Sequence, residues 1–182
     1  MKTSILVLLV FLVNLNLTVA QTPDHHSNII RVGIAPTTIG EDGGITFFNE
    51  LQFGIGNRLS VGPNLFFART GYFLDNKNVI TYITGIDLNV YYTLLKSEKA
   101  SLNVGPGITF QHRDYSAPEP VRFVSTDHQS VVDHSDKSGA IANLVYEGRI
   151  SDAWNIGIKS SWQALGRLEA MTYFGIYGGL KF

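Results

Sequence analysis

The chain contains no cysteine among its 182 residues. This absence excludes a disulfide and also a lipid anchor on a cysteine at a cleavage site. Charged side chains are scarce, at 16% of the residues, and 14 Lys and Arg nearly balance 15 Asp and Glu. Nucleic acid and other acidic polymers are therefore not expected partners. Beyond the first 20 residues, no apolar run approaches the ~20 residues that a membrane-spanning helix requires.

The N-terminus has the features of a secretory signal peptide. Lys2 gives a cationic start, 5–13 is an uncharged apolar run, and Thr18-Val19-Ala20 is a small-residue cleavage site. The alternative, a buried N-terminal helix, is disfavoured because the basic flank lies at the very start. We predict a signal peptide over 1–20, a short periplasmic lead over 21–27 and one folded domain over 28–182.

Apolar residues alternate with small or polar residues in eight segments. In the clearest segment, Leu102, Val104 and Ile108 alternate with Asn103 and Thr109. A period of two over such lengths indicates β-strands and not helices. The predicted strands are 28–36, 45–56, 59–70, 79–92, 101–111, 138–150, a strand beginning at 154, and 170–182.

Strands of roughly 9–13 residues match the length that crosses a bilayer at a tilt. The turns after the second, fourth and sixth strands are short, whereas those after the first, third and fifth are longer, and 112–136 is the longest. This asymmetry predicts an all-β, eight-stranded antiparallel up-and-down transmembrane β-barrel with 112–136 outside the cell. Pro63 and Pro106 each follow a Gly inside a predicted strand, and each should mark a bulge or a local gap in pairing.

Alternation alone does not decide which face of the barrel is wet. A soluble, lipocalin-like periplasmic ligand-binding barrel with its apolar face inward gives the same pattern. The opposite face carries mainly Gly, Ser, Thr, Asn and Gln, with few of the Lys and Glu that cover soluble surfaces, so we expect the apolar face to meet lipid. Aromatic girdles are expected at two levels, with Tyr92 and Trp154 near the short turns and Phe47, Phe67 and Phe110 near the other rim.

Charged residues also fall on the face that would line the barrel interior. An eight-stranded barrel is just wide enough for side chains to fill, and isolated buried charge is costly. We therefore predict a salt-bridge network that fills the lumen, with a conducting pore as the alternative. The predicted lumen network comprises Arg31, Glu50, Asp87, Glu147, Arg149 and Lys159.

The last strand ends on alternating apolar residues, and we predict that Ile176, Leu180 and Phe182 form an assembly and closure signal that pairs with 28–36. Together with Leu59-Ser60-Val61-Gly62-Pro63, the segment 86–92 and the segment 102–107, this ending resembles the small OmpA/OmpX-like outer-membrane β-barrels, the porin-like "outer membrane protein β-barrel domain" group. The resemblance implies location in the bacterial outer membrane, contact with outer-membrane lipid and lipopolysaccharide, and insertion by the barrel assembly machinery. It implies no single activity.

Segment 112–136 holds three of the five histidines, His112, His128 and His134, with Asp127, Asp133 and Asp136 nearby. Their spacing matches no strong metal motif, so neither a metal nor a cofactor is predicted. His134-Ser135-Asp136 has the residue types of a catalytic triad, as in a barrel enzyme that modifies lipid A, but a triad is defined by geometry. The preferred hypothesis is a non-enzymatic barrel with no catalytic residue. In it, 112–136 contacts ligands or supports the envelope.

Overall fold

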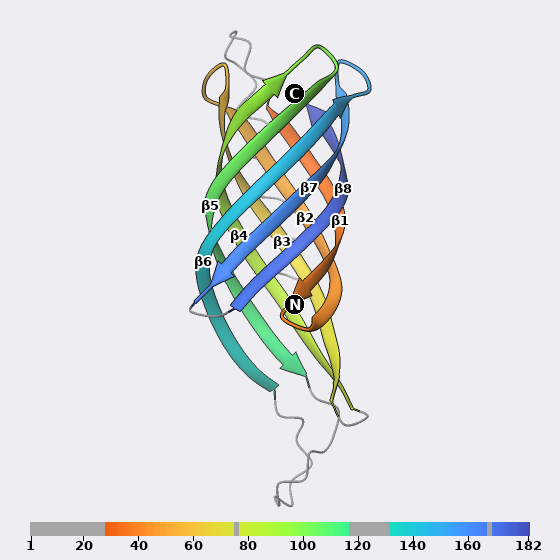
Figure 1. Cartoon of the computed structure of the whole chain (residues 1–182), viewed down its shortest axis with the longest axis vertical. Coiled ribbons are helices and arrows are strands. Elements are labelled where there is room, and N and C mark those ends of the chain that lie inside the picture. Colours follow the sequence, from red (N-terminus) through yellow and green to blue (C-terminus); the bar gives the residue numbers. More distant parts are fainter. Residues whose placement is uncertain (1–27, 75–76, 117–131, 167–168) are drawn as a thin grey trace, which may run out of the picture.

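A computed structural model describes residues 28–74, 77–116, 132–166 and 169–182, and the predicted signal peptide (1–20) and lead (21–27) lie outside these ranges. Antiparallel strands pair in chain order, and the last pairs with the first, which closes a barrel (Figure 1). The predicted eight-stranded up-and-down barrel is confirmed. No helix in the described ranges is long and apolar enough to cross a membrane. The strands are β1 (Ile29–Ile39), β2 (Asp42–Gly54), β3 (Leu59–Leu74), β4 (Lys77–Lys96), β5 (Ala100–Ser116), β6 (Val132–Arg149), β7 (Trp154–Leu165) and β8 (Glu169–Lys181).

Several strands are longer than their alternation predicts. Residues 112–116 and 132–136, expected within a polar loop, belong to the continuous ladder between β5 and β6. The longer loop expected after the first strand is also wrong, because only Gly40 and Glu41 separate β1 from β2, with Gly40 at φ 58°. Polar residues occupy both faces of the β5 and β6 extensions, so the period-two signal fades there while backbone pairing continues.

The two ends of the barrel differ in length. The short turns 55–58, 97–99 and 150–153 lie at the same end as the end of β8, whereas the β3–β4 and β5–β6 hairpins extend furthest at the opposite end (Figure 1). Within the described residues, β7 pairs with β6 only from Gly139 onward. Among the described residues, the stretch 132–138 of β6 therefore pairs with β5 alone.

The two prolines that break the alternation produce the predicted irregularities. Neither Pro63 in the β2–β3 ladder nor Pro106 in the β4–β5 ladder has a paired residue, and the register is the same on both sides of each gap. Both are therefore local gaps and not bulges, as expected where a donor is missing. The register shift of the β4–β5 ladder lies elsewhere, between Thr93 and Leu95.

Glycines on the inner face make room for large aromatic side chains. Phe48 and Phe66 are buried in the lumen, and each ring covers a glycine of the adjacent strand, Gly33 and Gly85 respectively. Tyr91 and Tyr177 cover Gly105 and Gly157 in the same way. An added Cβ at any of these glycines would overlap a ring, which explains why small residues recur on the predicted lumen face.

Candidate functional site

Four charged side chains from four strands meet inside the barrel. Arg31 of β1 donates from Nη1 to Glu50 of β2 at 2.6 Å and from Nη2 to Glu147 of β6 at 2.9 Å. Lys159 of β7 donates to the second carboxylate oxygen of Glu50. All four are buried, and their formal charges cancel. We call Arg31, Glu50, Glu147 and Lys159 the lumen network.

Aromatic and amide groups complete the hydrogen bonds of this network. Tyr91 donates to Glu50 at 2.7 Å, and Tyr177 donates to Glu147 at 3.2 Å. The Arg31 guanidinium also lies 5.3 Å from the centre of the Tyr177 ring, within the range of a cation–π contact. Neither tyrosine was among the residues predicted for the network from sequence. Their parity would have identified them, because Tyr91 shares a face with Asp87 and Asn89, and Tyr177 shares one with Gly175 and Gly179.

Two residues grouped with the network from sequence lie apart from it. Asp87 is buried, but it accepts hydrogen bonds from Asn64 at 2.7 Å and Gln163 at 3.3 Å and forms no ion pair with any residue in the described ranges. Arg149 is not one of the paired groups, because its half-exposed side chain pairs with Asp152 in the turn between β6 and β7. Its parity predicts the inward face, and at the end of β6 it lines the cavity at the short-turn end and does not reach the network.

A cavity of about 660 Å³ opens at the short-turn end. Arg31 and Glu147 of the lumen network are among its lining residues. Toward the opposite end, Arg113 pairs with Glu169 and also donates to Gln111 at 3.0 Å. The lumen is thus crossed by polar contacts at two levels. Arg113 was missed from sequence because it falls inside the segment expected to be a loop.

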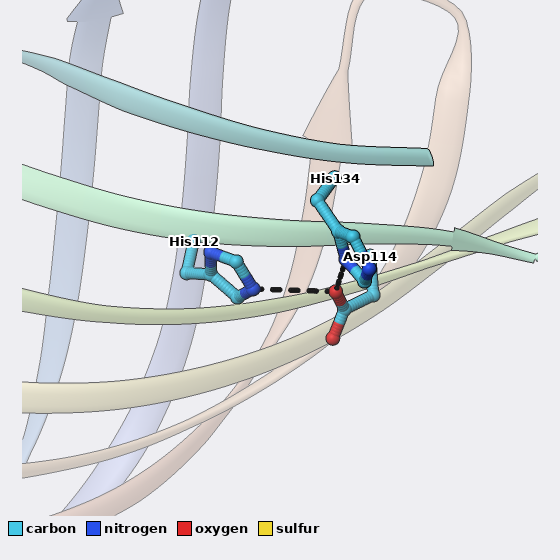
Figure 2. A group of neighbouring side chains, drawn as sticks. All are labelled: His112, Asp114 and His134. Carbon is cyan, nitrogen blue, oxygen red and sulfur yellow. Dashed lines mark hydrogen bonds and ion pairs between the residues drawn. The ribbon is translucent and has the colours of Figure 1, made fainter. Parts of the chain in front are cut away.

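A second polar group lies on the outward face of β5 and β6, beyond the apolar positions Ile108 and Phe110. His112 and His134 both turn toward Asp114 (Figure 2), with His112 Nε2 at 3.3 Å and His134 Nδ1 at 2.5 Å from its Oδ1. His112 Nδ1 lies 2.7 Å from Asp136 Oδ1. This hydrogen bond to Asp136, with a further contribution from the Asp114 charge, raises the pKa of His112 above its ordinary value. We call His112, Asp114, His134 and Asp136 the rim cluster.

His134, Ser135 and Asp136, which have the residue types of a catalytic triad, are not arranged as one. Ser135 lies on the face of β6 opposite His134 and Asp136, since consecutive strand residues alternate, and His134 pairs with Asp114 on β5. Asp127 and His128 lie outside the described residues.

The terminal strand pairs with β1, close to the stretch predicted from sequence. Ile176 faces Ile34 and Leu180 faces Ile30, and the Phe182 amide donates to the Asn28 carbonyl at 3.0 Å. All three side chains predicted as a closure signal, those of Ile176, Leu180 and Phe182, point outward and are exposed.

Large apolar side chains cover the outside of the barrel. The residues expected in the two girdles all lie on this surface, with Trp154 at 55% exposed and Phe47 at 54%. An inverted, lipocalin-like barrel would bury these side chains and expose the lumen network. The burial pattern is the opposite. The exposed aromatic residues of the expected girdles are Phe47, Phe67, Tyr92, Phe110 and Trp154.

No protein-family model matches the chain, and no curated protein matches it either. Solved structures do match in shape. Neisserial surface protein A has a TM-score of 0.64, at 10% identity over 87% of this chain and all of its own. Ail, the attachment invasion locus protein of Yersinia pestis, solved in complex with the heparin analogue sucrose octasulfate, has 0.63, with the same identity and coverage. The outer membrane protein OprG from Pseudomonas aeruginosa has 0.61, at 10% identity over 86% of this chain and 96% of its own. The chain therefore has the fold of the small OmpA/OmpX-like outer-membrane β-barrels.

Proposed function

We propose that this protein is a non-enzymatic integral protein of the bacterial outer membrane, exported with a signal peptide over 1–20 and folded over 28–182. The observation that carries the proposal is a closed barrel with an apolar outer surface and a polar interior. Closure pairs the edge strands β1 and β8, which suits the barrel to a hydrocarbon environment. The fold shared with outer-membrane proteins supports the same location and the same contacts with lipid and lipopolysaccharide.

Membrane fractionation combined with gel mobility tests the location. A folded barrel in detergent should migrate differently before and after boiling, and the protein should fractionate with the outer membrane. A soluble periplasmic protein whose mobility is indifferent to heat would contradict the proposal.

The filled lumen is the second part of the proposal. Its support is the lumen network together with the Arg113–Glu169 contact, since both cross the barrel interior. In planar lipid bilayers the purified barrel should give no stable single-channel conductance. A matched variant with R31A, E50A and Y91A removes two side chains of the lumen network and the tyrosine that donates to Glu50, and it should conduct. Steady conductance by the unmodified protein would contradict a closed lumen.

The β5–β6 hairpin and segment 112–136 form the proposed interaction surface. Among the described residues, the stretch 132–138 of β6 is paired on one side only, and exposed edges recruit extended strands from partners. Ail has been solved with a sulfated sugar analogue, but for this chain the edge favours a protein segment. Deleting 116–133 tests the role. The role is supported if the deletion variant still inserts as a barrel but an envelope phenotype of the unmodified protein is lost. It is contradicted if the variant keeps both barrel insertion and every envelope phenotype.

The outward residues Ile176, Leu180 and Phe182 are proposed to be the signal that the barrel assembly machinery reads. Replacing all three by Ser should reduce insertion in cells more than refolding into detergent, where no machinery acts. Equal losses in both settings would show a purely structural role.

Incubation with lipopolysaccharide tests the proposal that the barrel is not an enzyme. The position of Ser135 on the face opposite His134 and Asp136 supports a non-enzymatic barrel. Incubation with lipopolysaccharide should leave the acyl chains of lipid A unchanged by mass spectrometry. Released or added acyl chains would establish the enzyme alternative.

A further inference from the structure

The rim cluster brings two imidazoles and a carboxylate together on the outward face of β5 and β6. One ligand atom from each of His112, Asp114 and His134 lies within 4.8 Å of the others (Figure 2). Imidazole nitrogen and carboxylate oxygen are the ligands that Zn²⁺ takes in proteins that lack cysteine. We propose that His112, Asp114 and His134 bind a divalent transition-metal ion, with Asp136 as the residue that orients His112.

The strand pairing holds the three ligands in place. Asp114 and His134 are directly opposite in the β5–β6 ladder, and His112 lies two residues from Asp114 on the same face. Metal–ligand distances of about 2.0–2.2 Å need only small rotations of these side chains. Each is between 44% and 61% exposed, which leaves room for the ion and for water as a fourth ligand.

Asp136 supplies a hydrogen-bond acceptor for the His112 ring nitrogen that does not face Asp114. His112 Nδ1 lies 2.7 Å from the Asp136 carboxylate, while His112 Nε2 faces Asp114. With the proton held on Nδ1, the lone pair of Nε2 is free to bind the ion. A carboxylate on the second nitrogen is the usual partner of metal-bound histidine.

The charge of the cluster also favours a cation. Neutral imidazoles and two carboxylates carry a formal charge of −2. The cations next along the two strands, Arg113 and Lys137, lie on the alternate face, where both pair with Glu169. A bound ion would cross-link β5 to β6 just before the segment that joins them. The inference is independent of the proposed function, because it depends only on the geometry of the rim cluster and not on the lumen, the location or a partner of the β5–β6 hairpin.

Calorimetric titration with Zn²⁺ tests the proposal on the folded, untagged protein in detergent after removal of metal by EDTA. We expect one saturable site. H112Q, H134Q and D114N should each weaken Zn²⁺ binding by at least about 100-fold, and D136N by about 10-fold, the usual effect of losing such a partner. H25Q/H26Q is the matched control and should bind as the unmodified protein does.

Two further measurements keep the result interpretable. The heat-dependent gel shift should be retained by every variant, because the substituted side chains are exposed. Ring-nitrogen NMR should show direct metal contact at His112 Nε2 and His134. Absence of saturable binding, binding unchanged in H112Q/H134Q, or binding lost in H25Q/H26Q would each overturn the proposal.

Discussion

Arg31 and Glu147 are separated by 116 positions in the sequence, yet Nη2 of Arg31 lies 2.9 Å from Oε2 of Glu147 inside the barrel. They are not neighbours on adjacent strands, since Arg31 is on β1 and Glu147 on β6. The contact crosses the lumen, and both side chains are buried. This pair can form only because the barrel is closed.

Replacing Arg31 by Met should destabilise the barrel strongly. Glu147 would keep the hydrogen bonds from Tyr177 and Asn155 but lose its cation. Removing one partner of a buried ion pair costs about 3–5 kcal/mol. Denaturant unfolding in detergent, followed by tryptophan fluorescence, measures the loss. The double variant R31M/E147Q should recover part of it, and a single variant as stable as the parent would contradict the network.

Replacing Gly85 by Ala should destabilise the barrel through overpacking. An added Cβ would overlap the Phe66 ring and crowd the Phe110 carbonyl. Inserting a methyl group into a packed interior costs about 1–3 kcal/mol. The matched control is G178A, because Gly178 is exposed and an added Cβ there meets nothing within 4 Å. The same unfolding measurement should separate the two variants. Equal stability would show that the lumen relaxes around the added group.

A lysine in place of Ile176 should be costly if this surface meets lipid. Ile176 is 60% exposed and lies between Ile34 and Ile158 of the neighbouring strands. A lysine at the middle of the bilayer costs about 2–4 kcal/mol, against about 0–1 near the interface. The control is L95K, because Leu95 is close to a short turn. Unfolding from lipid vesicles measures both, and an equal effect would argue against a hydrocarbon environment at Ile176.

His112 should titrate above the ordinary histidine range in metal-free protein. Its hydrogen bond to Asp136 raises the pKa, so the folded state holds the proton more tightly than the unfolded chain. The resulting stabilisation is complete below the unfolded pKa and is lost as pH rises through the folded pKa. NMR of the ring protons in EDTA measures the value. D136N should lower the pKa, and an unchanged pKa in that variant would contradict the assigned cause.

The barrel could be predicted from sequence because period-two alternation reports the face of each residue directly. Ser101–Gln111 alternates without interruption, and β5 contains the whole of it. Alternation does not report, however, how far along the barrel axis a residue lies. Arg149 shares the parity of Glu147 but lies two pairs closer to the turn, where Asp152 is in reach. Depth depends on strand tilt and length, which alternation does not encode.

The rim cluster could be predicted from sequence only in part, and for a different reason. His112, His134 and Asp136 were noted, but Asp114 was not, and all were assigned to a loop. Their proximity depends on the register that places Asp114 opposite His134. Register across a long connection follows from the pairing of the whole hairpin, and no local pattern in 112–136 specifies it.

The seam between β1 and β8 has a consequence for the order of folding. Arg31 reaches Glu147 and Lys159 reaches Glu50 across that seam, from strands at opposite ends of the chain. In an open sheet Arg31 and Glu50 would still be opposite each other in the β1–β2 ladder, but the two contacts across the seam could not form. The Arg31–Glu147 and Lys159–Glu50 pairs therefore add nothing to early hairpins and act only on the final closing step. Glu147 and Lys159 exchange water for these partners together, which makes closure a cooperative and late event.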